Sequence, residues 1–363
     1  MGTPDPDSLG GPAACEPPFV AELRRLGVSV EEVTYVYGEK LTPTPITRRM
    51  KRVLTTAFHL KQKLKSASFE LLHLNTSFDA RALLRDIVTL TVIGRRSTKI
   101  FVKFHGSNAE LLGTSHPILR VLVRRLLSRV DGIGVLSTEE KKNFVRAGWD
   151  NRKIFVVPNV VERNPVQTNG NFNSRYHLRE GSPTLLFIAR FIPAKGLLDV
   201  IRACGLLREQ SVECALLCVG DGPARAAAEL ETDRLGLRER IKFLGQISEE
   251  KTAEFYANCT MLVFPTYHYE GFPMSVFYAA AAGLPIITTR IRATADYLGE
   301  PENCFWVEPR NPAMLAEKIA ALLGSMETRN RMSEANKELA HQFSAELVTQ
   351  KYLQVYQDLI ARP

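Results

Sequence analysis

The sequence predicts an α/β protein made of two doubly wound domains, each built around a parallel sheet. Short β-branched segments alternate with amphipathic segments along the whole chain, which is the pattern of β–α–β units. The 363 residues suffice for two domains that each bury their own core. A polar stretch near residues 160–180 separates two series of strands. We therefore expect a linker there and a cleft between the domains.

The first series of strands predicts an N-terminal domain over residues 1–165. Its strand candidates are SVEEVTYVY, FELLHLN, KIFVKFHG, GIGVLS and KIFVVPN. A doubly wound domain normally opens on an apolar strand that leads into a glycine-rich turn. Here only MGTPDPDS precedes the turn SLGGPA. We favour the interpretation that the first strand is missing over a sheet that is built without it.

The second series predicts a C-terminal domain over residues 166–345. Its strand candidates are PTLLFIAR, ECALLCVGDG, IKFLGQ, TMLVFPT, LPIITTR and CFWVEP. The remaining segment, residues 346–363, carries aromatic and aliphatic residues at helical spacing. It predicts a helix whose apolar stripe packs on another part of the chain.

Composition excludes several classes of protein. A chain that is 45% hydrophobic and 24% charged is not intrinsically disordered. The six cysteines form no CxxC pair and no zinc-ligand spacing, which favours buried free thiols in a reducing compartment. The sequence shows neither a signal peptide nor a run of about 18 apolar residues. We expect a cytoplasmic protein that does not span a membrane.

The segment YEGFPMSVFYAAAAGLPII predicts an anion site. Glu270 and Gly271 end a loop after a strand, and Pro273 suits the first turn of the helix that follows. The start of this helix faces the carboxyl edge of the sheet, with free backbone N–H groups at about residues 274–276, and such N–H groups bind anions. A strand-to-helix turn without a ligand is the alternative.

Two further motifs lie in the same predicted domain. Arg190 ends a strand and Lys195 follows in the next loop, so both cations can neutralise a diphosphate at the carboxyl edge. CVGDGP places Gly220 and Gly222 in a turn, for which we favour a structural role beside the ligand over direct phosphate contact. It is not a dinucleotide fingerprint, because Arg225 stands where the third glycine belongs, and this disfavours an oxidoreductase.

Taken together, these segments resemble the GT-B glycosyltransferases, specifically the retaining family 4 group that uses nucleotide-diphosphate sugars. The family's order is kept over nearly the whole chain by SLGGPA, FELLHLN, FHGSN, GIGVLSTEEKKNFVRAGW, VPNV, ARFIPAKG, VGDGP, FLG, EGFPMSV and AAGLPII. The resemblance implies two Rossmann-like domains, with the donor held by the C-terminal one and the acceptor by the N-terminal one. The last helix would cross back to the N-terminal domain.

The resemblance also implies roles for single residues. Arg190 and Lys195 match the pair on the donor diphosphate, and Glu270 matches the first glutamate of the E-x7-E motif, which contacts donor-sugar hydroxyls. His105 matches a histidine that reaches the transferred sugar, with a packed histidine at a strand end as the alternative. The other positions implied to bind the donor are Gly10, Gly11, Gly220, Gly271, Phe272, Pro273, Met274 and Ser275.

One position departs from the family's pattern. Tyr278 stands where the family has its second glutamate, which binds the ribose hydroxyls of the nucleotide. A carboxylate accepts from two hydroxyls, whereas a phenol accepts from one, so donor binding should weaken by about 1–3 kcal/mol. Three interpretations stay open: ribose contacts rebuilt around Tyr278, an altered nucleotide preference, or a relative that binds nucleotide or sugar without transferring it. We favour retained activity because the other four residues are present.

By resemblance, the reaction retains the anomeric configuration and needs neither a metal nor a cofactor. The donor's own phosphate would take the acceptor proton, so positioning and electrostatics supply most of the rate. The implied partners are a nucleotide-diphosphate sugar and a saccharide or lipid-linked acceptor, as in the biosynthesis of cell-envelope polysaccharides or glycolipids. The sequence does not fix the sugar, the base or the acceptor.

Charge is distributed unevenly between the two halves. Residues 1–170 hold 26 basic and 16 acidic side chains, whereas residues 171–363 hold 21 and 23. Residues 48–65 predict a helix with a cationic surface and one apolar stripe that contains Met50, Val53, Leu54, Ala57, Phe58 and Leu64. Docking on anionic lipid and packing in the core are equally favoured. Nucleic-acid binding is not expected, because aromatic residues do not interleave with the basic ones.

Overall fold

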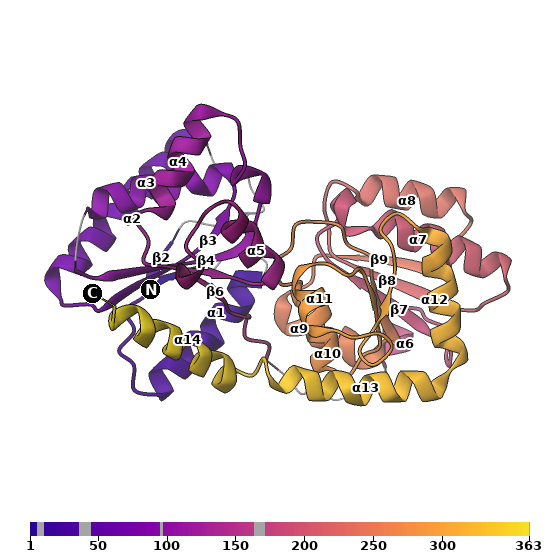
Figure 1. Cartoon of the computed structure of the whole chain (residues 1–363). Coiled ribbons are helices and arrows are strands. Elements are labelled where there is room, and N and C mark those ends of the chain that lie inside the picture. Colours follow the sequence, from indigo (N-terminus) through magenta and orange to yellow (C-terminus); the bar gives the residue numbers. More distant parts are fainter. Residues whose placement is uncertain (6–10, 36–44, 95–96, 163–170, 363) are drawn as a thin grey trace. The chain divides into compact units, whose positions relative to one another are not determined.

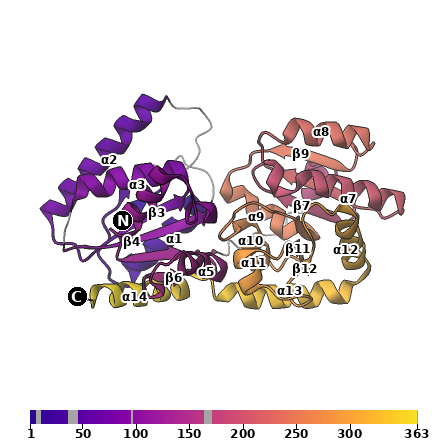
Figure 2. The ribbon, with the colours of Figure 1, turned by 45° about the horizontal axis from the view of Figure 1, so that its top comes forward.

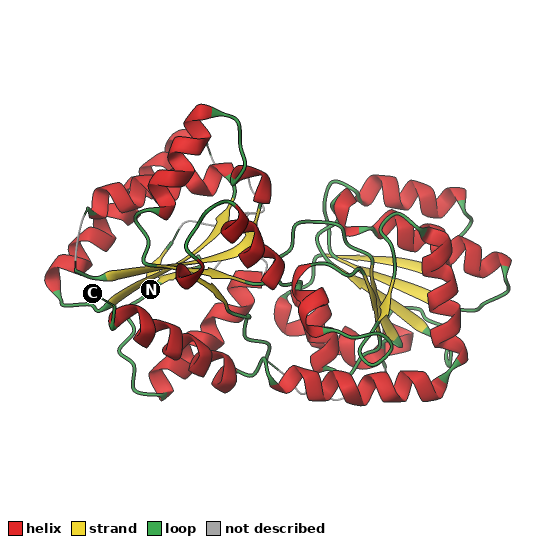
Figure 3. Ribbon diagram, viewed as in Figure 1, coloured by secondary structure: helices red, strands yellow, loops and turns green. Residues whose placement is uncertain are grey.

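The computed structural model describes residues 1–5, 11–35, 45–94, 97–162 and 171–362. It contains two six-stranded parallel sheets with helices beside them (Figures 1 and 3). This confirms the predicted α/β class with two doubly wound domains. The chain divides into two compact units. The first consists of Met1–Val160, Tyr269–Phe272 and Phe343–Pro363, and the second of Val161–His268 and Pro273–Gln342.

The unit boundaries differ from the predicted domain limits by a few residues. The first boundary between the units lies between Val160 and Val161. The limit predicted at residues 165/166 falls in a segment outside the described residues. The later change comes between Gln342 and Phe343, close to the limit expected at residues 345/346. The loop Tyr269–Phe272 lies in sequence within the second unit but belongs to the first.

The sheet of the first unit has the strand order β2-β1-β3-β4-β5-β6. Its strands are β1 (Gly2–Thr3), β2 (Val33–Thr34), β3 (Leu71–Phe78), β4 (Lys99–Ser107), β5 (Gly132–Val135) and β6 (Ile154–Val156). The order reverses between β1 and β3, and ligands of doubly wound sheets bind beside the carboxyl ends of the strands at such a reversal.

The first strand, which the sequence analysis expected to be missing, is present. Gly2 and Thr3 form β1, which pairs in parallel with β2 on one side and with β3 on the other. A Cβ atom at position 2 would lie 3.1 Å from Leu74 and 3.2 Å from Tyr35, so glycine fits this close packing. The expectation was wrong because a two-residue strand is too short to show an alternating or continuous apolar pattern.

Six α-helices and two short 3₁₀ turns complete the described part of the first unit. They are α1 (Gly11–Arg25), α2 (Ile46–Ser66), α3 (Ala80–Ile93), α4 (Pro117–Leu127), α5 (Thr138–Arg146), α14 (Ala345–Ile360), η1 (Ala109–Leu111) and η2 (Asn151–Lys153). Helices α2, α3 and α4 lie on one face of the sheet, and α1 and α14 lie on the other (Figures 1 and 2). No helix in the described residues is both long and apolar enough to cross a membrane.

The last helix packs within the first unit. One stripe of α14 is buried, and it contains Val348, Tyr352, Tyr356 and Leu359. This stripe contacts Phe19 of α1 and Phe101 of β4, with ring centroids 4.6 Å apart for Phe19 and Tyr352. Full burial of such side chains contributes about 2 kcal/mol each, which is enough to hold a single helix on the sheet.

The sheet of the second unit has the strand order β12-β11-β10-β7-β8-β9. Its strands are β7 (Thr184–Ile188), β8 (Ala215–Val219), β9 (Ile241–Gly245), β10 (Met261–Phe264), β11 (Ile286–Thr288) and β12 (Phe305–Trp306). β7, β8, β10 and β11 are buried at every position because helices cover both faces, which explains their continuous apolar sequences. The order reverses between β7 and β10.

Helices surround this second sheet (Figure 1). They are α6 (Phe172–Arg175), α7 (Leu197–Glu209), α8 (Arg225–Arg234), α9 (Glu249–Asn258), α10 (Met274–Ala281), α11 (Arg292–Tyr297), α12 (Pro312–Gly324), α13 (Met326–His341) and the 3₁₀ turn η3 (Pro193–Lys195). All six cysteines of the chain are free and buried, as the sequence predicted.

Candidate active site

In the second unit, two loops meet at the carboxyl ends of the strands where the order reverses. Arg190 and Lys195 lie in the loop after β7, and this loop contacts the loop after β10. The backbone N–H of Tyr267 donates to the carbonyl oxygen of Ala194 at 2.8 Å. A Cβ atom on Gly196 would lie 2.6 Å from the carbonyl oxygen of Pro265, so only glycine allows this approach.

The two predicted cations of this unit interact with each other. Lys195 is 9% exposed, and its ammonium lies 5.3 Å from the centroid of the Phe264 ring, whereas Arg190 is exposed. Burial lowers the pKa of Lys195 to about 7, and the positive charge of Arg190 adds to this effect. Two like charges placed together at a sheet edge are destabilising unless an anion is bound. The pair therefore fits a diphosphate.

The turn with Gly220 and Gly222 supports the loop that carries Arg190. Gly220 has φ of +134°, and a Cβ atom there would collide with the carbonyl oxygen of Ala189. Gly222 has φ of +151°, and its Cβ would lie 2.6 Å from the carbonyl oxygen of Phe191. The backbone N–H of Phe191 donates to the carbonyl of Asp221 at 2.8 Å. These contacts give both glycines the structural role that the sequence analysis favoured.

Helix α10 begins where the sequence analysis placed it, with Pro273 as the N-cap and Met274 as its first residue. Ser275 ties this helix to the sheet, because its hydroxyl donates to the carbonyl oxygen of Ile188 at the end of β7. The expectation of three free N–H groups was wrong for Val276, whose N–H donates to the carbonyl of Pro273 at 2.9 Å. Through the Ser275 bond, the start of α10 lies at the end of β7, the strand that leads into the loop with Arg190.

Tyr278 lies one turn further along α10. Its ring is partly buried, with a centroid 6.1 Å from that of Tyr256 on α9. Its side chain also hydrogen-bonds the carboxyl group of Glu249, the first residue of α9. Desolvation raises the pKa of this carboxyl, and the bond with Tyr278 lowers it in part. The structure thus places a carboxylate, which was not predicted from the sequence, beside the phenol that replaces the expected glutamate.

In the first unit, His105 lies at the carboxyl end of β4, and its side chain is 8% exposed. Its Nε2 atom lies 3.0 Å from Oδ1 of Asn75 and 3.3 Å from Oε1 of Glu16. Burial lowers the pKa of His105 to about 4, and the charge of Lys103 adds to this effect while Glu16 opposes it. The imidazole is therefore neutral at physiological pH.

Three buried polar residues near His105 were not predicted from the sequence. Glu16 lies on α1, Asn75 on β3 and Lys103 on β4, and each is almost fully buried. The ammonium of Lys103 donates to Oε1 of Glu16 at 3.0 Å. Isolated polar residues inside FELLHLN and KIFVKFHG were the available signal, because a polar side chain in a fully buried strand needs a partner.

Among the described residues, Cys15, Glu16 and His105 form a set whose ligand atoms lie within 4.8 Å of one another. The donor set does not fit a metal ion. The Lys103 ammonium already neutralises Glu16 Oε1, and burial raises the pKa of the Cys15 thiol far above its usual value. A divalent ion would have to displace a buried lysine and ionise a buried thiol.

The segment with Glu270 joins the first unit near His105. A Cβ atom on Gly271 would lie 2.8 Å from Leu136 and 3.1 Å from Oε2 of Glu140, so glycine is required by this close contact. A Cβ atom on Gly106, the residue after His105, would lie 3.3 Å from the carbonyl oxygen of Tyr269. The structure therefore brings the Glu270 segment and the carboxyl end of β4, which carries His105, together.

Two further contacts fix this segment. Phe272 packs against Phe343, with ring centroids 5.4 Å apart. Glu140 is buried beneath Gly271 and accepts from the hydroxyls of Ser107 at 2.6 Å and Ser137 at 3.0 Å. The motifs FHGSN, LSTEE and EGF thus meet through hydrogen bonds and close packing.

The N-terminal glycine pair is only partly described. Gly10 lies outside the described residues, and Gly11 is the first residue of α1. Gly11 therefore lies on the same helix as Glu16, the carboxylate beside His105.

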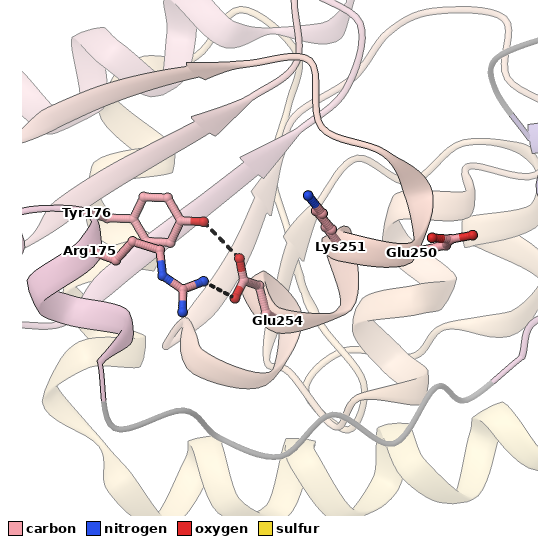
Figure 4. Close-up of a pocket in the computed structure, with 5 residues that line it drawn as sticks. All are labelled: Arg175, Tyr176, Glu250, Lys251 and Glu254. Carbon is pink, nitrogen blue, oxygen red and sulfur yellow. Dashed lines mark hydrogen bonds and ion pairs between the residues drawn. The ribbon is translucent and has the colours of Figure 1, made fainter.

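A pocket of about 450 Å³ lies elsewhere in the second unit, between α6 and α9 (Figure 4). Arg175 and Tyr176 both contact Glu254 there, each at 2.8 Å, and Glu250 and Lys251 complete the lining. Arg175 and Glu254 there form an ion pair, and none of the lining residues is a predicted site residue. We therefore place the candidate site at the sheet edges and not in this pocket.

The chain is similar in sequence to known protein families and to individual proteins. The family model "Glycosyl transferases group 1" matches residues 171–339, and "Glycosyltransferase Family 4" matches residues 17–164. An uncharacterized glycosyltransferase of Methanocaldococcus jannaschii is 27% identical over 305 residues, which is 82% of this chain and 78% of the relative. N-acetyl-alpha-D-glucosaminyl L-malate synthase of Bacillus anthracis is 26% identical over 74% of this chain and 70% of the relative.

The fold is also similar to that of solved proteins. HepE of Anabaena, in complex with UDP-glucose, matches with a TM-score of 0.75 and 17% identity, over 97% of this chain and 98% of HepE. The apo form of the lipopolysaccharide outer core galactosyltransferase WaaB matches with a TM-score of 0.70 and 17% identity, over 98% of each chain. At this level of identity the likeness shows the fold.

Proposed function

The chain belongs to the GT-B glycosyltransferases of the group 1 and family 4 type, and from this premise we propose that it transfers a sugar from a nucleotide-diphosphate donor to an acceptor hydroxyl. The observation that carries the proposal is the buried Lys195 beside Arg190 at the strand reversal of the second unit. Donor binding would place the diphosphate between these cations and the start of α10. UDP and UDP-glucose are suitable first probes, because HepE was solved with UDP-glucose.

The proposed catalysis is electrostatic. As the bond between sugar and diphosphate breaks, negative charge grows on the leaving group, and Arg190 and Lys195 stabilise it without a divalent ion. The guanidinium can bind two phosphate oxygens at once, and the ammonium acts as a point charge. The start of α10 adds the positive end of its helix dipole.

The sugar would be held by Glu270 and His105. The carboxylate of Glu270 accepts hydrogen bonds from sugar hydroxyls, and the neutral imidazole of His105 offers one further polar contact. Neither residue is needed as a covalent nucleophile if the donor phosphate accepts the proton of the acceptor hydroxyl on the same face. Such a reaction proceeds with retention of the anomeric configuration, and nuclear magnetic resonance of the product anomer tests it.

A second candidate is a protein that binds a nucleotide sugar without transferring it, and Tyr278 favours it. Two measurements distinguish these functions. Calorimetry measures the binding of UDP, GDP and ADP, and a hydrolysis and transfer assay measures turnover of the matching nucleotide sugars. Sub-millimolar binding with turnover supports the enzyme, and binding without turnover supports the second candidate. Absence of binding for all three nucleotides contradicts both.

The diphosphate role has its own test. Lys195→Ala removes the buried ammonium, and we expect turnover to fall because the charge on the leaving group is no longer balanced. Unchanged turnover would remove Lys195 from the mechanism. Lys242→Ala is a matched control, since Lys242 lies within β9 of the same sheet and has no proposed contact with the donor.

We also propose that α2 docks on an anionic membrane surface. The apolar residues of this helix form two separate sets. Ala57 and Leu60 are buried against the unit, whereas an outward stripe is exposed and consists of Ile46, Met50, Leu54 and Phe58, with exposures of 75%, 62%, 43% and 58%. The stripe argues against packing of the whole apolar face in the core, which was the alternative for this helix.

Basic side chains accompany the outward stripe. They are Arg48, Arg49, Lys51, Arg52, Lys61, Lys63 and Lys65, and the helix has no acidic residue. Arg52 and Lys63 pair with Asp5 and Glu31, and the remaining cations can meet lipid phosphates at about 1 kcal/mol each. An amphipathic helix of this kind lies in the membrane interface and would bring the first unit to a lipid-linked acceptor.

A further inference from the structure

A buried network around His105 determines which nitrogen of the imidazole carries the proton. The two groups close to Nε2 are Oδ1 of Asn75 at 3.0 Å and Oε1 of Glu16 at 3.3 Å. Oδ1 is the acceptor of the Asn75 amide, because Nδ2 donates to the carbonyl of Gly2 at 3.1 Å and to Oε2 of Glu16 at 2.9 Å. Glu16 and the carbonyl of Gly2 together fix the orientation of the amide that faces His105.

Glu16 is an ionised acceptor in spite of its burial. Its side chain is 1% exposed, and burial alone would raise its pKa. The charge of Lys103 and the bond with His105 together lower the pKa of Glu16 well below its usual range. Both atoms close to Nε2 can then only accept a hydrogen bond. The proton of the neutral imidazole must lie on Nε2.

The opposite nitrogen is left as an acceptor. Nδ1 of His105 is buried and has no hydrogen-bond partner among the described residues. With the proton on Nε2, Nδ1 carries a lone pair and accepts a hydrogen bond. An unsatisfied buried acceptor is costly, and in a candidate site it indicates a ligand group that donates to it.

We propose that Glu16 is a positioning residue that holds His105 as the neutral Nε2–H tautomer, directly and through Asn75, so that Nδ1 accepts a hydrogen bond from a hydroxyl of the bound sugar. The assignment of the ligand rests on the proposed function, whereas the assignment of the tautomer does not. A hydrogen-bond acceptor at Nδ1 selects a sugar that has a free hydroxyl facing this atom. A carboxylate or an ether oxygen there has no hydrogen to donate to Nδ1 and is disfavoured.

The test uses the full chain without donor, labelled with ¹⁵N-histidine. Two-dimensional ¹H–¹⁵N spectra distinguish the Nε2–H tautomer, the Nδ1–H tautomer and the imidazolium, and the signal of His105 is identified by its loss in His105→Gln. We expect the pure Nε2–H pattern at pH 7. An Nδ1–H pattern or an imidazolium pattern overturns the proposal. This spectrum alone tests the tautomer assignment, because it requires no substitution in the network around His105.

A paired variant tests the role of Glu16. Glu16→Leu with Lys103→Met removes both charges together, so no unpaired charge stays buried. The imidazole then loses the acceptor Glu16 Oε1, and the Asn75 amide is held only by the carbonyl of Gly2, so it turns more readily. We expect the pure Nε2–H pattern to be lost and Nδ1–H signals to appear. A variant that folds and keeps the pure Nε2–H pattern overturns the role of Glu16.

A second buried network in the same unit supplies the matched control. Asp86 accepts from Tyr35, Thr76 and Arg85, each at 2.7 Å, and does not contact His105. Arg85→Met with Asp86→Leu perturbs the unit comparably, and we expect it to leave the His105 pattern unchanged. Loss of the Nε2–H pattern in this control as well would make the effect a general loss of packing and overturn the role of Glu16.

The ligand part is tested with UDP-glucose and its deoxyfluoro analogues. A fluorine keeps the size and the acceptor character of a hydroxyl but cannot donate. We expect fluorination at one position to weaken binding as much as removal of the hydroxyl at that position does. In His105→Gln, the affinity difference between UDP-glucose and this fluorinated analogue should disappear. If every fluorinated analogue binds as UDP-glucose does, the acceptor role of Nδ1 is overturned. Absence of sugar transfer with a pure Nε2–H spectrum would instead contradict the proposed function.

Discussion

Gly220 leaves the space that the carbonyl oxygen of Ala189 occupies, since a Cβ atom at position 220 would collide with that oxygen. Ala189 precedes Arg190, so the turn after β8 sets the backbone from which Arg190 projects. The direct effect of this turn is on the position of a cation, because its backbone packs against the loop that carries the arginine.

Gly220→Ala should therefore destabilise the second unit and weaken diphosphate binding together. The added methyl group forces the turn or the Arg190 loop to move, and overpacking with backbone strain costs about 2–4 kcal/mol. Urea unfolding and UDP calorimetry measure the two effects. Gly181→Ala is the control, because Gly181 also has positive φ, at +75°, but no atom lies within 4 Å of its added Cβ. Equal effects of the two substitutions would contradict the prediction.

Lys195 should make stability depend on pH. Its pKa is lowered to about 7 in the folded protein from a usual value of 10.5. Between these values the unfolded chain holds more protons than the folded one, so stability rises with pH over this window. For one group the slope approaches about 1.4 kcal/mol per pH unit. The unfolding free energy of the wild type should rise relative to that of Lys195→Met between pH 7 and pH 9, and parallel curves would refute the prediction.

The same lysine should couple donor binding to proton uptake. A diphosphate beside Lys195 supplies the missing negative charge and raises its pKa, so the complex formed near pH 8 gains a proton. Calorimetric titrations with UDP in buffers of different ionisation enthalpy measure this uptake. Lys195→Met should abolish it while leaving some binding through Arg190. Buffer-independent heats in the wild type would exclude Lys195 as a contact of the diphosphate.

Local sequence was sufficient for the parts of the site that depend on local structure. Arg190, Lys195 and the start of α10 follow from strand ends and a proline N-cap, and the structure brings them to one strand reversal. The partners of His105 could not be found in this way. Glu16 and Lys103 are 87 positions apart, and their contact depends on the packing of α1 against the sheet. Residues that are buried and polar in strands were the one local sign of such a network.

Two other differences have similar physical causes. The sequence pattern placed the apolar residues of α2 in one stripe, but helical period alone does not tell which apolar residues face the protein and which face outward. In the structure Ala57 is buried while Phe58 is exposed. For β1, pairing partners on both sides stabilise a strand of two residues, and no periodic signal exists in so short a segment.

Tyr278→Phe should weaken binding of the nucleotide but not of its phosphates. If the phenol hydroxyl contacts a ribose hydroxyl, its removal costs about 1 kcal/mol, or roughly a fivefold rise in the Kd of UDP. Pyrophosphate has no ribose, and its Kd should stay unchanged, which provides an internal control. The bond between Tyr278 and Glu249 is also lost, so the pKa of Glu249 should rise further. Equal Kd changes for both ligands would show that Tyr278 acts only through the packing of α10.

The outward stripe of α2 should bind anionic vesicles through both charge and apolar burial. Met50→Ser, Leu54→Ser and Phe58→Ser together remove three side chains that contribute little to folding, because each is exposed. If these side chains insert into lipid, their loss should cost about 3 kcal/mol or more, a hundredfold or greater drop in partitioning. Flotation with phosphatidylglycerol vesicles measures the drop, and vesicles of phosphatidylcholine alone should recover little protein in either case.

Two controls separate docking on lipid from loss of structure. Leu230 on α8 is 71% exposed in the second unit, so Leu230→Ser tests whether any exposed apolar residue supports flotation. We expect it to leave flotation unchanged. Leu60 lies on α2 but is 2% exposed, and Leu60→Ser should lower the unfolding free energy by a few kcal/mol, about the cost of a cavity and a buried hydroxyl. The triple variant and the wild type carry the same helix charge. If they float equally well, the outward stripe has no role in membrane binding.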